Sequence, residues 1–122
     1  MIRTALALAL ISAPAVAAEQ TPSKPAPAPQ LSLDHRMLVR CSAAFAIIAT
    51  GQANDEAQAK NYPAMAERGR EFFVRASAQV MDEAGLDRTQ IAAALSAEAR
   101  DLRANGALDQ VMPTCLSLLP AE

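Results

Sequence analysis

The stretch Cys41–Ala49, CSAAFAIIA, decides the fold because it carries no charged residue on any side. A helix that is apolar on all sides must be surrounded by other elements. Met37 and Leu38 continue its helical spacing upstream, and Ser32 is a suitable N-cap. Gly51 offers a left-handed C-cap. We therefore predict a central helix from about Ser32 to Gly51.

The second helix is predicted to run from Tyr62-Pro63 to Ala84. Proline fits the first turn of a helix, and Gly85 provides a stop. One apolar stripe follows helical spacing: Met65, Gly69, Phe72, Phe73, Ala76 and Val80. A glycine inside a helix is about 1 kcal/mol less favourable than alanine. We therefore expect another helix to approach closely at Gly69.

The third and fourth helices have their own signals. Asp87 and Gln90 match a capping box at the start of the third, and Asn105-Gly106 stops it. The fourth places apolar residues at helical spacing: Leu108, Val111, Met112, Cys115 and Leu119. Pro113 interrupts it, which predicts a kink or a late start. Period-two alternation is absent, so residues 31–122 are predicted to form an all-α domain, a small four-helix bundle.

The N-terminal residues show the order of features of a cleavable signal peptide. Met1–Thr4 carries one positive charge, Ala5–Ala13 is apolar, and Ala15–Ala18 supplies the small residues for cleavage after Ala17 or Ala18. An ordinary N-terminal helix is the alternative, but the polar segment that follows could not pack against it. The apolar run is also shorter than the about 20 residues of a membrane-spanning helix. We expect residues 1–18 to be removed and the protein to be periplasmic or secreted.

Residues 19–30, EQTPSKPAPAPQ, hold four prolines and no bulky apolar side chain. Such a composition favours extended polyproline II and cannot form a core. We expect a disordered Pro/Ala-rich linker that tethers the domain. A proline-rich docking peptide is the alternative.

The charge of the mature chain excludes some partners. Residues 19–122 hold ten Lys and Arg and thirteen Asp and Glu, a net charge of −3. Non-specific binding to nucleic acid depends on clustered positive charge. We therefore expect no nucleic-acid partner and no membrane insertion after cleavage.

Two cysteines, Cys41 and Cys115, remain after the expected cleavage. Two cysteines in a small exported domain usually pair. Closing a loop of about 75 residues stabilises a fold by at most about 4.5 kcal/mol. A redox or metal site is the alternative, but the sequence has no CxxC motif and two thiols alone do not make a zinc site. We predict a structural disulfide.

His35 is the only histidine and is expected near solvent in the first turn of the first helix. A catalytic histidine needs an orienting carboxylate and a nucleophile. Asp34 is adjacent in the sequence and therefore points elsewhere on a helix. The serines lie outside any GxSxG motif, and no nucleotide-binding loop is present. We expect no catalytic residue, no metal site and no cofactor, in a protein that is not an enzyme.

Arg68–Arg75, RGREFFVR, is the most distinctive stretch. Arg68 and Arg75 lie two turns apart on one side of the predicted helix, and Arg70 lies between them. Guanidinium groups bind carboxylates through paired hydrogen bonds, so these three arginines are the candidate site for an acidic partner. The alternative is that their stems only shield the phenylalanines.

Glu67 and Glu71 share a helix face and would suit a metal ion or acid–base chemistry. Arginines stand near them at favourable spacing, Glu67 with Arg70 and Glu71 with Arg75. We therefore expect a solvated face with internal ion pairs.

Four motifs occur in order: Arg40–Phe45 (RCSAAF), RGREFFVR, Met81–Leu86 (MDEAGL) and Pro113–Leu116 (PTCL). In this order the chain resembles a group of small exported alphaproteobacterial helical proteins without an assigned activity, over residues 36–119. That resemblance carries no functional residue to transfer. In gross plan the chain is also similar to periplasmic acid-stress chaperones, which are small, helical and exported with one disulfide, although their cysteines lie closer together.

These features predict an exported, non-enzymatic helical module that binds a protein partner or itself. The alternative is an envelope-stress chaperone or an inhibitor of an envelope enzyme. A chaperone should expose apolar surface on acidification, whereas an inhibitor should be rigid and carry a charged epitope. A carrier of a small ligand or metal is a weaker alternative.

Overall fold

The computed structural model describes residues 27–121, which form four α-helices and a short 3-10 helix. These are α1 (Leu33–Ala53), η1 (Ala59–Asn61), α2 (Arg68–Ala84), α3 (Arg88–Leu102) and α4 (Ala107–Ser117). No strand occurs within residues 27–121, and the predicted all-α helical bundle is confirmed. The expected signal peptide and most of the expected linker lie outside the described residues.

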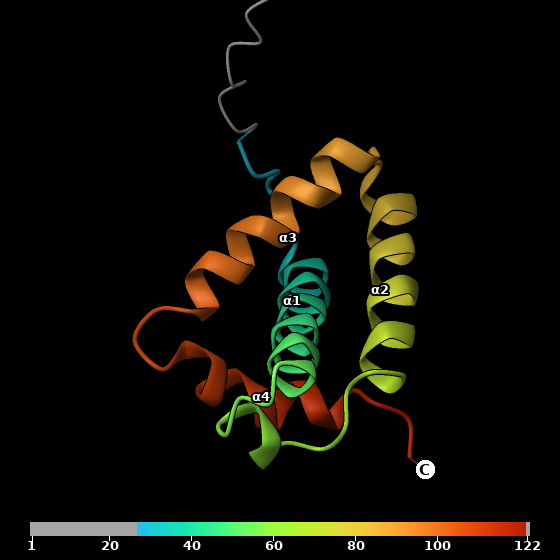
Figure 1. The fold of residues 1–122 in the computed structure, drawn as a ribbon. Helices are drawn as coiled ribbons and strands as arrows, with labels where there is room; N and C mark the ends of the chain where they lie inside the picture. Colours follow the sequence, from blue (N-terminus) through green and yellow to red (C-terminus); the bar gives the residue numbers. More distant parts are fainter. Residues whose placement is uncertain (1–26, 122) are drawn as a thin grey trace, which may run out of the picture.

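Helix α1 is the centre of the fold, and α2, α3 and α4 all pack against it (Figure 1). Every residue of Cys41–Phe45 is at most 4% exposed. The prediction of a central helix is confirmed. One strip of α1 is nevertheless uncovered, because Ala46 and Thr50 are exposed.

The end of α1 differs from the prediction. Gly51 is not a left-handed cap, since the helix continues to Ala53 and Asp55 takes the left-handed conformation, with φ 58°. Gly51 is buried, and a Cβ placed on it would lie 2.7 Å from the Cβ of Ala59 in η1. This glycine therefore serves a close contact rather than a turn of the backbone.

Helix α2 begins later than predicted. Pro63 lies in a non-helical stretch after η1, and the helix starts at Arg68. The Gln52 side chain on α1 holds this stretch: its Nε2 donates to the carbonyls of Tyr62 and Pro63 at 3.2 and 2.9 Å. Its Oε1 accepts the backbone N–H of Met65 at 2.9 Å. These bonds satisfy backbone groups that a helix would satisfy internally, which explains why the proline does not start a helix.

The Tyr62 side chain joins the same stretch to α4. Its hydroxyl donates a hydrogen bond to Oδ1 of Asp109, and Nε2 of Gln58 donates to Oδ2 at 3.1 Å. The hydrogen bond between the Tyr62 hydroxyl and Asp109 raises the pKa of Tyr62 to about 12, with smaller effects from burial and from the charge of Asp109. The cause is that loss of the proton would place a phenolate beside a carboxylate.

Helices α2 and α3 meet at a short turn and diverge from it (Figure 1). Gly85 takes the left-handed conformation there, with φ 66°. The predicted capping box is confirmed: the Gln90 N–H donates to Oδ1 of Asp87 at 2.8 Å, and the Asp87 N–H donates to Oε1 of Gln90 at 2.9 Å. The turn therefore ends one helix and starts the next within three residues, 85–87.

Helices α1 and α2 approach each other closely at Gly69. This residue is buried, and a Cβ placed on it would lie 3.2 Å from the Cβ of Phe45 on α1. The predicted helix contact at Gly69 is confirmed. One turn later, the rings of Phe72 and Phe45 meet edge to face with centroids 5.1 Å apart.

Helix α4 is joined to α1 by the predicted disulfide between Cys41 and Cys115. Their Cα atoms are 5.2 Å apart, and both residues are fully buried. Pro113 lies inside α4, which begins at Ala107, so the predicted late start is wrong. Six residues precede the proline in the helix, so its missing N–H removes one internal hydrogen bond without preventing the start.

Candidate functional site

The structure separates the three arginines of the Arg68–Arg75 stretch. Arg68 is half-buried, and its Nη2 donates a hydrogen bond to the carbonyl of Pro120 at 2.8 Å. Arg70 and Arg75 are exposed. Arg68 therefore holds the C-terminal segment against α2, whereas the other two arginines face solvent.

Arg70 and Arg75 border an open depression of about 490 Å³, hereafter the Arg70–Arg75 depression. Its other lining residues are Glu71, Val74 and Pro120. Val74 is 60% exposed, which is unusual for a large apolar residue of this small domain. Protein-binding surfaces are enriched in arginine and have apolar centres. The depression therefore combines two arginines and an exposed apolar residue with one carboxylate, Glu71.

The expected ion pairs on this face do not form. Neither Arg70 nor Arg75 makes an ion pair with any residue in the described part of the chain. Glu67 is the N-cap of α2 and keeps a right-handed helical conformation, but it forms no ion pair with Arg70. Glu71 lies in the first turn, where the helix dipole favours a carboxylate without help from Arg75. Both guanidinium groups are consequently open to a partner.

Arg70 and Arg75 each line a hollow that also includes a phenylalanine. Arg75 lines a small cleft together with Phe72, which is only 7% exposed. Arg70 lines a second hollow together with the half-buried Phe73. Each arginine thus lies next to an aromatic residue while its charge stays exposed, so shielding and partner binding do not exclude one another.

A polar network around the buried Glu98 joins α1 and α3, and it was not predicted from the sequence. Glu98 accepts hydrogen bonds from Nε of Arg36 at 2.8 Å and from Nη1 of Arg40 at 2.6 Å. Arg40 also contacts Oδ2 of Asp101 at 2.6 Å. Burial would lower the pKa of Arg40, but the hydrogen bonds and charges of Asp101 and Glu98 outweigh it and raise that pKa. A signal was present, because an acidic residue falls on the inward stripe of α3, four residues after Ala94.

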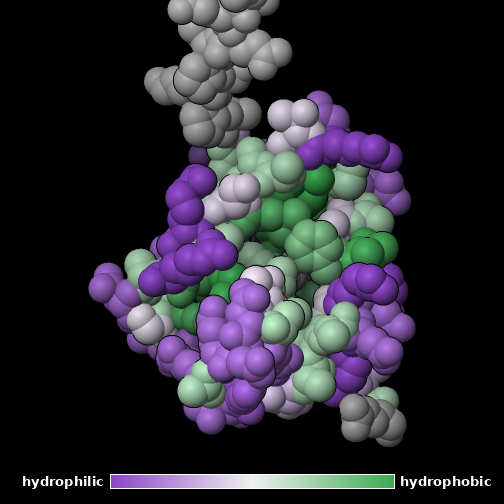
Figure 2. All heavy atoms as spheres, viewed as in Figure 1, coloured by the Kyte–Doolittle hydropathy of each residue, from purple (hydrophilic) through white to green (hydrophobic). Residues whose placement is uncertain are grey.

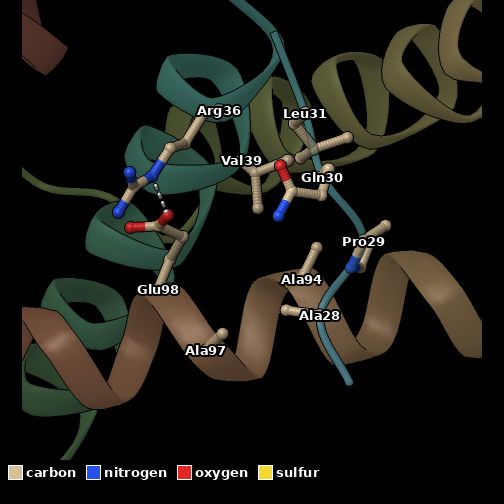
Figure 3. A pocket seen from close by; sticks show the side chains of 9 residues that line it. All are labelled: Ala28, Pro29, Gln30, Leu31, Arg36, Val39, Ala94, Ala97 and Glu98. Atoms are coloured by element: carbon tan, nitrogen blue, oxygen red, sulfur yellow. Dashed lines mark hydrogen bonds and ion pairs between the residues drawn. The ribbon is translucent and has the colours of Figure 1, made fainter. Parts of the chain in front are cut away.

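Figure 3 shows Glu98 and Arg36 at the rim of a cavity of about 260 Å³ between α1, α3 and the end of the expected linker. Ala28, Pro29, Gln30 and Leu31 line one side of it. Both carboxylate oxygens of Glu98 are already engaged by arginines. We therefore regard this network as a link between helices rather than as a ligand site.

His35 was expected near solvent and without a carboxylate partner. In the structure it is paired with a carboxylate and mostly buried. Its side chain is 19% exposed, and Nε2 lies 2.7 Å from Oε2 of Glu83 near the end of α2. Within residues 27–121, no hydroxyl or thiol forms a hydrogen bond with the imidazole. Asp34 is the adjacent carboxylate in the sequence, whereas the carboxylate that pairs with His35 is brought by the fold from 48 residues away.

No group of three or more His, Cys, Asp or Glu side chains in the described part of the chain is placed to hold a metal ion. Within the same residues, no helix is long and apolar enough to cross a membrane. Comparison of the chain with protein families, curated proteins and solved structures finds no match.

Proposed function

We propose that the protein is an exported, non-enzymatic helical module that binds an acidic protein partner at the Arg70–Arg75 depression. One observation carries the proposal: two arginines without an ion pair among the described residues flank Val74, which is 60% exposed. An acidic partner would satisfy both guanidinium groups, and an apolar side chain at its centre would cover Val74.

Export to the periplasm or beyond is supported by the signal-peptide features of residues 1–18 and by the disulfide. Disulfides persist in oxidising compartments and are rare in the cytoplasm. The intact mass of protein from its native host should correspond to a chain that starts at Ala18 or Glu19. A retained Met1 would contradict export by this route.

Of the two alternative functions, an inhibitor of an envelope enzyme has the better support. An inhibitor benefits from a rigid scaffold, because less freedom is lost on binding. The disulfide and the Arg36–Glu98–Arg40 network both tie α1 to other helices. An acid-stress chaperone would instead expose apolar surface at low pH, which the fluorescence of a hydrophobic dye would report.

The proposal is tested by capture of partners from a periplasmic extract with Arg70→Gln/Arg75→Gln. Glutamine keeps most of the side chain and removes the charge, so the fold should persist while the partner is lost. Arg68 is left unchanged because it holds Pro120. The control is Arg88→Gln/Arg100→Gln, which changes the net charge equally at exposed positions on α3. Retention of the partner by the first variant, or equal loss in both, would contradict the proposal.

A further inference from the structure

A groove runs over the uncovered strip of α1, between α2 and α3. Two hollows of about 230 and 300 Å³ share Ala46, Thr50 and Phe73 and so form one continuous groove, hereafter the α1 groove. Figure 2 shows apolar residues gathered in a hollow between these two helices. Most of the α1 residues in the lining are small, Ala43, Ala46, Ala49 and Thr50, and they allow the backbone of an occupant to come close.

The charged residues that line this groove are all positive. Its lining contains no Asp or Glu, and its two charged residues are Arg70 of α2 and Arg103 at the end of α3. Neither arginine forms an ion pair within residues 27–121. The chain as a whole has a net charge of −2, so the positive charge of the groove is opposite in sign to the net charge of the protein.

The two arginines stand at the same end of the groove. Helices α2 and α3 meet at the turn around Gly85 and diverge, so the start of α2 and the end of α3 are their far ends (Figure 1). Arg70 and Arg103 are therefore on opposite walls at the open end. The floor between the walls is apolar, and the positive charge is concentrated where the groove widens.

We propose that the α1 groove receives an amphipathic helix of a protein partner, with acidic residues at the end of that helix that lies between Arg70 and Arg103. The positive charge of Arg70 and Arg103 requires negative charge on the facing end of the occupant. The apolar floor requires an apolar stripe along the helix that covers it. Helices pack with axes 8–10 Å apart, and small residues at Ala46 and Thr50 favour the shorter distance. This inference rests on the proposed function and names the partner segment; Arg70 belongs to both surfaces, so one partner can cover both.

The test uses the disulfide-bonded protein, labelled with ¹⁵N, and two synthetic helical peptides with the same apolar face. One peptide carries glutamates at one end, and the other carries lysines there. The acidic peptide should shift the amide resonances of Ala46, Thr50 and Ala99 and bind at least about tenfold more tightly at low salt. Equal binding of the two peptides, or absence of shifts in the groove, would overturn the inference.

Two groove variants, Ala46→Trp and Arg103→Gln, and one control, Ala78→Trp, separate the groove from the depression. Ala46→Trp fills the groove at an exposed position and should weaken the acidic peptide at least about tenfold, whereas Ala78→Trp, exposed on α2 outside both surfaces, should not. Circular dichroism checks that both variants fold. Arg103→Gln should weaken the acidic peptide without changing the depression.

The outcomes distinguish the two proposals. If Arg103→Gln and Ala46→Trp leave peptide binding unchanged while Arg70→Gln/Arg75→Gln loses the natural partner, the groove inference fails and the proposed function stands. If the peptide binds as expected but no variant affects a natural partner, the proposed function fails. Self-association that Ala46→Trp abolishes would identify a second copy as the occupant and overturn the inference.

Discussion

Arg40 on α1 and Glu98 on α3 are joined by a 2.6 Å hydrogen bond, and their side chains are only 19% and 9% exposed. Glu98→Gln removes the carboxylate that Arg36 and Arg40 share, and Arg40 keeps Asp101 as a partner. Because charged hydrogen bonds at a nearly buried position are lost, the free energy of unfolding should fall by about 1–3 kcal/mol. Asp101→Asn is the matched control in the same network. Its side chain is 58% exposed, and the loss should stay below about 1 kcal/mol. Urea denaturation of the wild type and both variants would measure these losses, and a Glu98→Gln midpoint equal to that of the wild type would show that the network does not stabilise the fold.

The close approach at Gly69 predicts intolerance of larger side chains. Gly69→Leu should overpack the contact with Phe45 and lower the free energy of unfolding by about 1–3 kcal/mol, despite the better helix propensity of leucine. Ala78→Leu, at an exposed position on the same helix, should change stability little. An unchanged denaturation midpoint for Gly69→Leu would place this glycine away from α1.

The disulfide predicts a large effect of reduction. Cys41→Ala/Cys115→Ala should lower the free energy of unfolding by up to about 4.5 kcal/mol, because the unfolded chain loses its closed loop. Thiol counting on denatured, non-reduced protein should find no free thiol. Wild-type protein unfolded in reductant should resemble the double variant, and the same midpoint with and without reductant would contradict the prediction.

Tyr62 predicts a stability change in the alkaline range. The ordinary pKa of tyrosine, near 10, describes the unfolded chain, and the folded state raises it to about 12. Folding therefore favours the protonated hydroxyl, so its contribution is fully present below about pH 10 and is lost as pH rises toward about 12.

Titration of near-ultraviolet absorbance measures Tyr62 directly, since the chain has one tyrosine and no tryptophan. Asp109→Asn removes the carboxylate and should return the midpoint toward 10. A wild-type midpoint near 10 would mean that the hydrogen bond with Asp109 does not persist in solution.

The helices were predictable where local chemistry determines them. The uncharged run Cys41–Ala49 indicated the central helix, and Asp87 with Gln90 indicated the start of α3. The end of α1 at Gly51 and the start of α2 at Pro63 were predicted wrongly, because a tertiary contact overrides the local preference of each residue. Gly51 is needed for contact with Ala59, and Pro63 is held outside a helix by the side chain of Gln52.

The candidate site was predictable only in outline. Sequence spacing placed Arg68 and Arg75 on one face, but the fold of the C-terminal segment decides that Arg68 bonds Pro120 while Arg75 remains open. The pairs of His35 with Glu83 and of Arg40 with Glu98 join residues far apart in the chain. Helical periodicity reports which side of one helix faces inward, and it does not say which residue of another helix lies opposite.

The place of α1 in the chain has a consequence for biogenesis. Proteins are synthesised from the N-terminus, so the helix on which all others pack is made before any of its neighbours. The apolar run of α1 therefore stays exposed until the helices that cover it are made. Cys41 cannot form its disulfide until Cys115, 74 residues later in the chain, has been synthesised. The disulfide can therefore form only in a chain that includes α4, and a chain interrupted before α4 keeps a free thiol at Cys41.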